Sequence, residues 1–269
     1  MTGKTLGIMG CGNIGGALAS AACDISDNIR KIVLWDTDTS KVEALEKNIP
    51  NAKAANSIEE FVELSDIIVE AVSPSVVKDI LERAIAAGKD SLIMSVGGVL
   101  GNEKLLHQAA GRGIRVILPS GAISGIDALK AASVAGIDTV TITTRKPVKS
   151  IKGAPYFEEQ GIDVDAITTE TTVFEGNAAS AIKVFPKNIN VSALLSIAGI
   201  GAEKTMVKIV VSPEYTKNSH EVVIKGRSGT ITTRTENVPS PQNPKTSYLA
   251  ILSAIATLKG YFNSVQVGT

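Results

Sequence analysis

The fold of this chain is decided by the stretch LGIMGCGNIGG, residues 6–16. An apolar run leads into it, Gly10, Gly12 and Gly15 follow at G-x-G-x-x-G spacing, and the apolar segment 17–23 leaves it. This order predicts a strand, a tight turn and a helix. In such a turn the first glycine permits the backbone reversal, the second lets phosphates approach the backbone, and the third lets the helix lie close to the strand. The free N–H groups at the helix start would then face the phosphates.

The segment after this helix strengthens the prediction of a dinucleotide site. Residues 32–35, IVLW, predict a second strand that leads to Asp36, about 20 residues past the glycine turn. A carboxylate there accepts from ribose hydroxyls and repels a 2′-phosphate, so we expect NAD in preference to NADP. Lys41 would partly neutralise such a phosphate, which keeps NADP as a second candidate. The cofactor contacts predicted in this region are Gly10, Gly12, Asn13, Ile14, Gly15 and Asp36.

Composition narrows the class of protein. The 269 residues are 44% hydrophobic and 20% charged with a formal net charge of zero, which predicts a soluble globular chain with neither a nucleic-acid nor a membrane partner. No signal-like or membrane-spanning run is visible, so we expect a cytoplasmic location. The two cysteines, Cys11 and Cys23, predict no metal site. Cys11 is either a small residue that fits the glycine turn or a thiol open to alkylation.

The first half of the chain alternates apolar strand-like segments with helical ones. This pattern predicts a Rossmann-type α/β fold, a doubly wound parallel sheet. Ligands of such sheets bind at the carboxyl ends of the strands, where two segments, 71–74 and 119–125, are rich in small residues. Ordinary tight connections would explain these segments equally well. As ligand contacts we expect Ala71 and Ser73 on the cofactor and Ser120 and Ser124 on the substrate.

From residue 126 the pattern changes to β-branched segments separated by Gly, Pro, Asn and Ser turns. It predicts a second α+β domain with a largely antiparallel sheet, interrupted by helices over 177–184 and 190–198. A last helix over 246–259, capped by Thr246 or Ser247, is expected to pack on the first domain. The expected domains are therefore residues 1–125 with 241–269 for the dinucleotide, and residues 126–240 for substrate binding and dimerisation.

Only two histidines are present. His107 lies in a helical segment beside two leucines, which favours a structural role. His220 is expected at the start of a strand after a polar turn, with Asn218 two positions before it. A histidine there either faces a cleft and transfers protons near neutral pH or has no chemical role, and its position alone does not decide between these alternatives.

Several longer blocks resemble the L-aspartate dehydrogenase family. They are GCGNIG (10–15), PSGAISGIDALKAA (119–132), TTRKP (143–147), FEGNAASAIKVFPKNINVSALLSIAG (174–199), NSHEVVIKGRSG (218–229) and NVPSPQNPKTSYLAILSAIATL (237–258). The resemblance implies a Rossmann domain completed by the C-terminal helix, a homodimer through the open sheet of the second domain, and oxidative deamination of L-aspartate. It further implies that His220 is the catalytic histidine and that Ala122 and Asn188 contact the cofactor.

The reaction implied by the resemblance transfers hydride from the aspartate α-carbon to nicotinamide. The product, iminosuccinate, can hydrolyse to oxaloacetate and ammonia or pass to a downstream enzyme of NAD synthesis. His220 would accept the amine proton or activate the attacking water. Two substrate carboxylates need donors, and the start of the last helix is one candidate. The expected substrate contacts are Ser120, Ser124, Lys187, Asn218 and Thr246.

Two rival hypotheses remain at this point. One is another two-domain reductase of the homoserine dehydrogenase or dihydrodipicolinate reductase type. The other is an NAD-binding sensor without catalysis, against which the polar segments around His220 and 186–188 argue. A homodimer is also expected from the strands over 139–144 and 206–211, because one small domain has few helices to cover both faces of its sheet.

Overall fold

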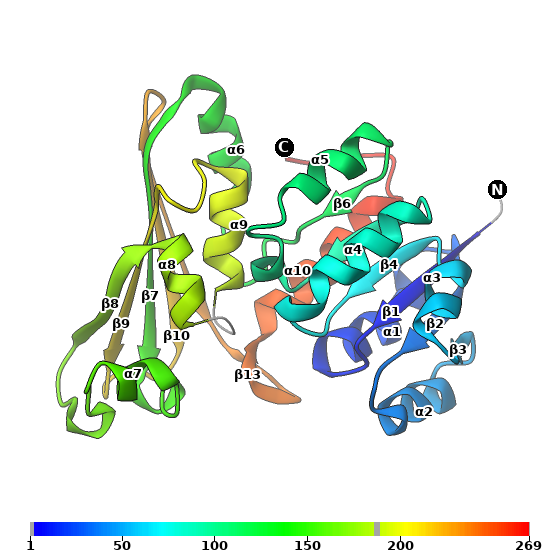
Figure 1. Cartoon of the computed structure of the whole chain (residues 1–269), viewed down its shortest axis with the longest axis horizontal. Coiled ribbons are helices and arrows are strands. Elements are labelled where there is room, and N and C mark those ends of the chain that lie inside the picture. The colour runs from blue at the N-terminus through cyan, green and yellow to red at the C-terminus, as the bar shows by residue number, and fades with distance from the viewer. Residues whose placement is uncertain (1–2, 186–188, 269) are drawn as a thin grey trace. The chain divides into compact units, whose positions relative to one another are not determined.

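The computed structural model describes residues 3–185 and 189–268, and the chain forms two compact units (Figure 1). The first unit ends at Pro119 and is completed by Ile251–Gln266, while Ser120–Ala250 belongs to the second. Both divisions differ from those expected after residue 125 and before residue 241. Residues 120–125 hydrogen-bond to a strand of the second unit, and residues 243–247 form a strand there, so both segments belong with that unit.

The first unit contains a six-stranded parallel sheet in the order β3-β2-β1-β4-β5-β6. This is the doubly wound dinucleotide-binding order, with the switch point between β1 and β4. Its strands are β1 (Lys4–Met9), β2 (Ile29–Trp35), β3 (Ala52–Ala54), β4 (Ile67–Glu70), β5 (Asp90–Ile93) and β6 (Val116–Ile117). Its helices are α1 (Asn13–Ile25), α2 (Thr39–Asn48), α3 (Ile58–Leu64), the 3₁₀ turns η1 (Pro74–Val76) and η2 (Val96–Gly98), α4 (Val77–Ala86) and α5 (Lys104–Gly111).

The local sequence explains these elements. Strand β4 is buried along its whole length, as its uninterrupted Ile-Ile-Val run predicts for a parallel sheet covered on both faces. Ser57 caps α3 by accepting from the Glu60 N–H at 3.1 Å. Asp38 caps α2, because its carboxylate accepts from the Ser40 N–H at 3.2 Å. In this half of the chain, the capping residues and the apolar pattern of the sequence thus explain the observed helices and strands.

The C-terminal helix α10 (Tyr248–Phe262) closes one face of this sheet. Ala254 and Leu258 are fully buried in the same core as β1 and α1. At its last turn the Tyr261 hydroxyl donates to Asp90 at 2.6 Å and accepts from Lys4 at 3.0 Å, which fixes the helix to two strands. The helix begins two residues later than expected. Among the described residues, none of the helices is both long and apolar enough to span a bilayer.

The second unit contains a five-stranded mixed sheet in the order β11-β10-β7-β9-β8. All of its pairs are antiparallel except β7 with β9. The strands are β7 (Ile137–Pro147), β8 (Thr171–Asn177), β9 (Thr205–Ser212), β10 (Asn218–Gly226) and β11 (Gly229–Asn237), and β12 (Pro239–Ser240) pairs separately with β13 (Asn243–Ser247). The helical elements are α6 (Ile126–Ala135), η3 (Val148–Ser150), α7 (Pro155–Glu159), η4 (Val164–Ala166), α8 (Ala178–Val184) and α9 (Asn190–Ala198).

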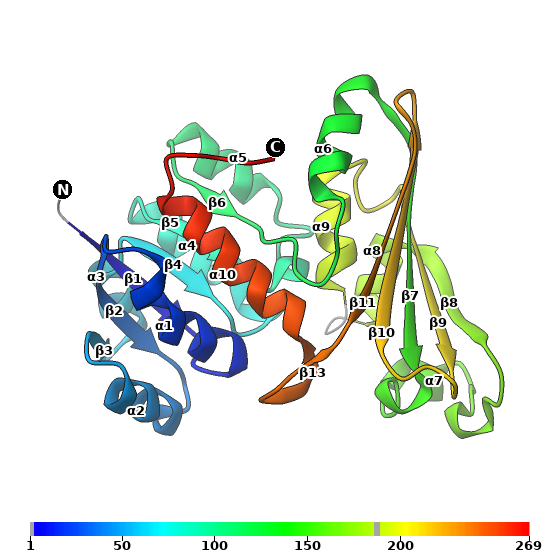
Figure 2. The same cartoon turned by 180° about the vertical axis from the view of Figure 1, so that it is seen from behind.

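Helices of the second unit cover one face of its sheet. Within this unit, α6, α8 and α9 lie on the same side of the strands in both views (Figures 1 and 2). Val140, Ile142, Val222 and Ile224 point to that side and pack with helix residues such as Leu195. The opposite face carries threonines and charged residues, half-buried or exposed, at the alternate positions. The sequence analysis missed α6 and α7, and η4 and a turn precede β8.

Candidate active site

The glycine turn joins β1 to α1. Gly10 has a φ of +93°, and a Cβ there would lie 2.6 Å from the Ala71 carbonyl oxygen. At Gly15 a Cβ would lie 1.8 Å from the Gly10 carbonyl oxygen, so only glycine lets α1 approach the strand this closely. Gly12, which precedes α1, has no atom within 4 Å of an added Cβ. The turn therefore packs tightly on the protein side and leaves open space beside its middle glycine. Asn13 and Ile14, at the start of α1, are half-buried.

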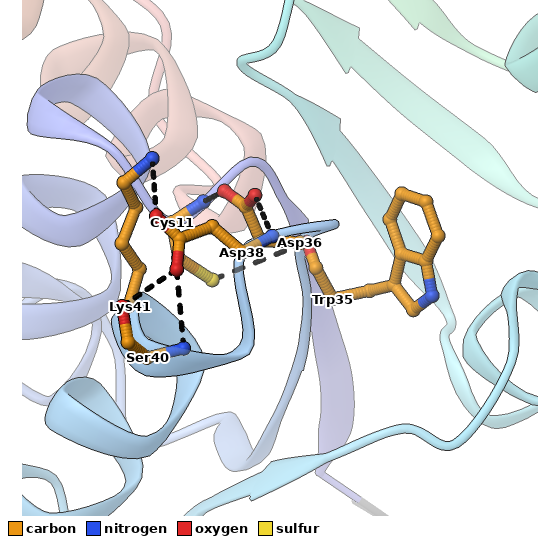
Figure 3. A network of polar contacts seen from close by, with 6 residues as sticks. All are labelled: Cys11, Trp35, Asp36, Asp38, Ser40 and Lys41. Carbon is orange, nitrogen blue, oxygen red and sulfur yellow. Dashed lines mark hydrogen bonds and ion pairs between the residues drawn. The ribbon is translucent and has the colours of Figure 1, made fainter.

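Asp36 fixes the next part of this site (Figure 3). Its carboxylate accepts from the Cys11 N–H at 2.7 Å and from the Asp38 N–H at 2.9 Å, and thus ties the end of β2 to the glycine turn. Lys41 forms an ion pair with Asp38 at 3.2 Å.

Cys11 is buried, and this burial, assisted by the Asp36 charge, raises the pKa of its thiol to about 12. The side chain therefore fits the turn as a small neutral group, and its burial and raised pKa disfavour the alternative of an alkylation-sensitive thiol.

Glu70 at the end of β4 links two loops at the same edge of the sheet. Its carboxylate accepts from the N–H groups of Val72 and Ser73 and from both the N–H and the hydroxyl of Ser95, at 2.8–3.1 Å. Burial raises the pKa of Glu70, and the hydrogen bonds act in the opposite direction. The first loop contains Ala71, whose carbonyl lies against Gly10. Glu70 thereby fixes the backbone beside the glycine turn.

The loop over residues 120–125 is bound to strand β11 in the second unit. The Ala122 carbonyl accepts from the Thr235 hydroxyl at 2.9 Å and from the Asn237 amide at 3.0 Å. The Ser124 carbonyl accepts from Thr233 at 3.1 Å. Ala122 is buried, whereas Ser124 is exposed and Ser120 is half-buried. These bonds hold the loop over the sheet face that carries His220, since Thr235 is the cross-strand partner of His220.

His220 is the third residue of β10, close to the expected strand start, and only 8% of its surface is exposed. Its Nδ1 lies 3.0 Å from the hydroxyl oxygen of Thr144, its partner on β7. Lys146, two residues further along β7, points to the same sheet face and is also buried. Burial, with a smaller contribution from the Lys146 ammonium, lowers the pKa of His220 to about 4. Burial likewise lowers the pKa of Lys146 to about 8.

A cavity of about 170 Å³ lies beside Asn218, the first residue of β10, in the second unit. It brings together two of the expected substrate contacts, Asn218 and Thr246. Thr246 lies in strand β13, so the expectation that it opens a helix is wrong: the residues before Tyr248 pair with β12 instead. The expected contacts Lys187 and Asn188 lie outside the described residues. No group of His, Cys, Asp or Glu suited to a metal ion occurs in the described ranges.

Comparisons with known proteins agree over nearly the whole chain. Residues 127–261 match the family model described as aspartate dehydrogenase, C-terminal, and residues 10–119 match the NAD-binding domain of homoserine dehydrogenase. The L-aspartate dehydrogenase of Methanosarcina mazei is 43% identical over 98% of this chain and 99% of its own. This chain belongs to the L-aspartate dehydrogenase family. The family member from Nitrosopumilus maritimus is 42% identical over 99% of this chain and 100% of its own.

The solved structures support the same assignment. The aspartate dehydrogenase of Thermotoga maritima superimposes with a TM-score of 0.76 at 27% identity, over 98% of this chain and 99% of that one. This L-aspartate dehydrogenase family member is therefore an NAD(P)-dependent oxidoreductase with a Rossmann-type domain. The residues at the first-unit site fit such a cofactor, because the space beside Gly12 is open and the Asp36 carboxylate lies next to it at the turn.

Three site residues were missed by the sequence analysis: Glu70, Lys146 and Asn237. Lys146 stands inside a quoted family block, and strand alternation would have placed it on the same face as Thr144. No sequence signal showed that this face would meet His220, since Thr144 and His220 are 76 positions apart. Glu70 was assigned to a strand without a role. Its function depends on the Ser95 loop, which is also distant in sequence.

Proposed function

We propose that this protein catalyses the NAD-dependent oxidative deamination of L-aspartate to iminosuccinate, which hydrolyses to oxaloacetate and ammonia. The observation that carries the proposal is the buried His220, Thr144 and Lys146 group in a member of this family. A cytoplasmic location and a place upstream of an NAD-synthesis enzyme are part of the same proposal. When bound, the cofactor supplies the acceptor for the hydride that leaves the substrate α-carbon.

His220 supplies the proton acceptor. With a pKa of about 4 the imidazole is neutral at pH 7, so it can take a proton from the substrate ammonium. Acceptance through Nε2 requires that Nδ1 carries the hydrogen and donates to Thr144. Once the amine is neutral, its lone pair forms the C=N bond as the Cα–H bond breaks. After the imidazolium releases this proton to solvent, the neutral ring can take a proton from the water that attacks the imine carbon.

Lys146 supplies a positive charge for a substrate carboxylate. A carboxylate paired with this ammonium would cancel the field that helps to lower the pKa of His220. Substrate binding therefore raises the basicity of His220 toward the working pH, where a general base is most effective. In the first unit, the turn around Gly12 would hold the pyrophosphate and Asp36 the ribose hydroxyls. The loop carrying Ala71 and Ser73 would complete the cofactor contacts.

The direct test is NADH formation, followed at 340 nm, when L-aspartate is added to the purified protein with NAD. Homoserine replaces aspartate as the control, and oxaloacetate and ammonia are assayed as products. Formation of NADH with homoserine but not with aspartate would reject the proposal. Absence of turnover with either, despite NAD binding, would favour a sensor.

We also propose a homodimer through the open face of the second-unit sheet. This face presents Thr141, Val223 and Thr232 along three adjacent strands, and none of them is fully buried in the single chain. A sheet face without helices is commonly covered by a second copy. Light scattering at micromolar concentration should give twice the 28.0 kDa chain mass. Val223→Arg should shift the protein toward monomer, and Lys130→Glu on the exposed side of α6 should not. A monomeric wild type contradicts this assembly.

A further inference from the structure

One amide oxygen in the second unit is buried and lacks a partner. Asn237 is 4% exposed, and its Oδ1 accepts no hydrogen bond from any described residue. Its Nδ2 donates to the Ala122 carbonyl at 3.0 Å. That bond fixes the orientation of the amide, because only the nitrogen can donate to a carbonyl. An unsatisfied buried carbonyl oxygen is costly, so a site built this way favours a ligand that brings a donor.

The space next to Asn237 suits a small charged ligand. Asn237 lines the cavity of about 170 Å³ described above, well below the ~300–1,000 Å³ of pockets for larger ligands. Ser247 lines it too, and its hydroxyl is another buried polar atom without a hydrogen-bond partner among the described residues. The exposed Lys149 and Lys217 line the same cavity and complement carboxylates. An amino acid with an acidic side chain combines the donor that Oδ1 needs with the anionic groups that the lysines favour.

Strand register relates Asn237 to His220. Asn237 pairs with Asn218, and His220 pairs with Thr235, so Asn237 and His220 are diagonal neighbours on one face of adjacent strands. Diagonal neighbours in a sheet lie about 7–8 Å apart at the backbone. An amine bound to Oδ1 of Asn237 therefore lies within reach of the imidazole that is to receive its proton.

We propose that Asn237 binds the α-ammonium group of the substrate through Oδ1 and so makes the site selective for amino acids. The inference rests on the proposed deamination of aspartate. The same side chain holds Ala122 through its nitrogen and the substrate through its oxygen. Ser247 is placed to donate to a carboxylate oxygen of the same molecule.

The experiment compares two variants that each remove one bond to Ala122. Asn237→Ala removes the hydrogen bond from Nδ2 to the Ala122 carbonyl and also removes the unpaired Oδ1 acceptor. Thr235→Val removes only the hydrogen bond from the Thr235 hydroxyl to the same carbonyl. Loss of a hydrogen bond to a charged group should raise the KM for L-aspartate about 10- to 100-fold in Asn237→Ala. Succinate has both carboxylates but no ammonium, so its inhibition constant should change less than about 3-fold. Thr235→Val should leave the ratio of these two constants as in the wild type.

Three outcomes overturn the inference while leaving the proposed function intact. In the first, Asn237→Ala weakens aspartate and succinate equally, and in the second the two variants behave alike. In the third, the KM for aspartate does not change. Asn237→Ser, whose short hydroxyl reaches neither the Oδ1 nor the Nδ2 position but keeps a polar group in the buried site, serves if the alanine variant does not fold, and the same selective loss is expected. A wild type that never oxidises aspartate rejects the proposed function instead, and this inference with it.

Discussion

Glu70 in the first unit and His220 in the second are both buried titratable groups, and their surroundings differ. The Glu70 carboxylate accepts four hydrogen bonds from its own chain. Within the described ranges the His220 ring has one hydrogen bond, to Thr144, and Lys146 lies near it. A buried group whose hydrogen-bonding sites are all occupied by the protein's own donors serves to hold those donors in place. A group with capacity left over can exchange protons with a ligand, and this contrast supports the proposal that Glu70 positions two loops while His220 transfers protons.

The contrast extends to the elements that carry each group. Glu70 ends a strand that is buried on both faces, and its partners are mostly backbone N–H groups of two loops. His220 stands in a sheet with one helix-covered face, beside side chains that can be removed one at a time. Variants in the two places should therefore separate cofactor binding from turnover.

The largest effect is expected for His220→Ala. Loss of a general base should lower kcat with aspartate by ~100- to 10,000-fold, with little change in the Kd for NAD. His107→Ala, at an exposed position on α5, is the control and should keep wild-type kcat. Because His220 is buried, its removal should also lower the free energy of unfolding by about 1–3 kcal/mol. Steady-state kinetics measure the change in kcat, and urea unfolding measures the change in the free energy of unfolding. Near wild-type turnover by His220→Ala would remove His220 from the mechanism.

The pH dependence of stability should report the same burial. His220 has a folded pKa of about 4 and an unfolded value near 6.5, so between these pH values the unfolded chain binds more protons. The stability contributed by the neutral ring is complete above pH 6.5 and is lost as the pH falls toward 4. Urea unfolding at pH 7 and pH 4.5 should show a larger loss for the wild type than for His220→Gln. Equal losses would mean that the ring is not buried in neutral form.

Lys146→Met should act on substrate affinity. Removing a buried ammonium that pairs with a carboxylate should raise the KM for aspartate about 10- to 100-fold. Since the pKa of Lys146 is about 8, its charge is lost as the pH rises through that value. Succinate inhibition of the wild type should weaken above pH 8, and the Lys146→Met variant should show no such dependence. A wild-type inhibition constant that is flat from pH 7 to 9.5 would exclude this charge as a ligand of the carboxylate.

A smaller effect is expected for Glu70→Gln. The amide nitrogen would face N–H donors of the loops, so the backbone beside Gly10 should shift and the KM for NAD should rise about 3- to 30-fold. The value of kcat at saturating NAD should remain near that of the wild type. Glu60→Gln is the matched control, because Glu60 also accepts from a backbone N–H but lies outside this loop pair. A drop in kcat without a change in cofactor KM would contradict the positioning role.

The smallest effect concerns cofactor choice. Asp36→Ser should raise the ratio of kcat/KM for NADP to that for NAD, by about 10-fold, because the carboxylate that repels a 2′-phosphate is gone. The change is limited because Asp36 also holds the Cys11 N–H, so binding of both cofactors should weaken. Asp24→Ser, at an exposed position near the far end of α1, is the control and should leave this ratio unchanged. A wild type that prefers NADP would reject the role of Asp36.

The sequence by itself determined the first unit in considerable detail. The glycine spacing, the buried run of β4, the capping serine at residue 57 and the position of Asp36 all follow from patterns that span a few residues. Such patterns are local, since side-chain period and turn chemistry act between near neighbours. The family resemblance added His220 and Ala122 as candidate site residues, and the structure places both in the second unit, although Ala122 was expected in the first.

Only the tertiary structure decided how the second-unit site is assembled. Thr144 meets His220, and Ala122 meets Asn237, across 76 and 115 positions of sequence. These contacts depend on which strands become neighbours and in what register, and the sequence pattern of a single strand does not contain that information. The same pairing buries Lys146 and His220 and lowers the pKa of both. Sequence thus specified the residue types available for chemistry, and strand pairing determined their environment, because burial is a property of the assembled sheet.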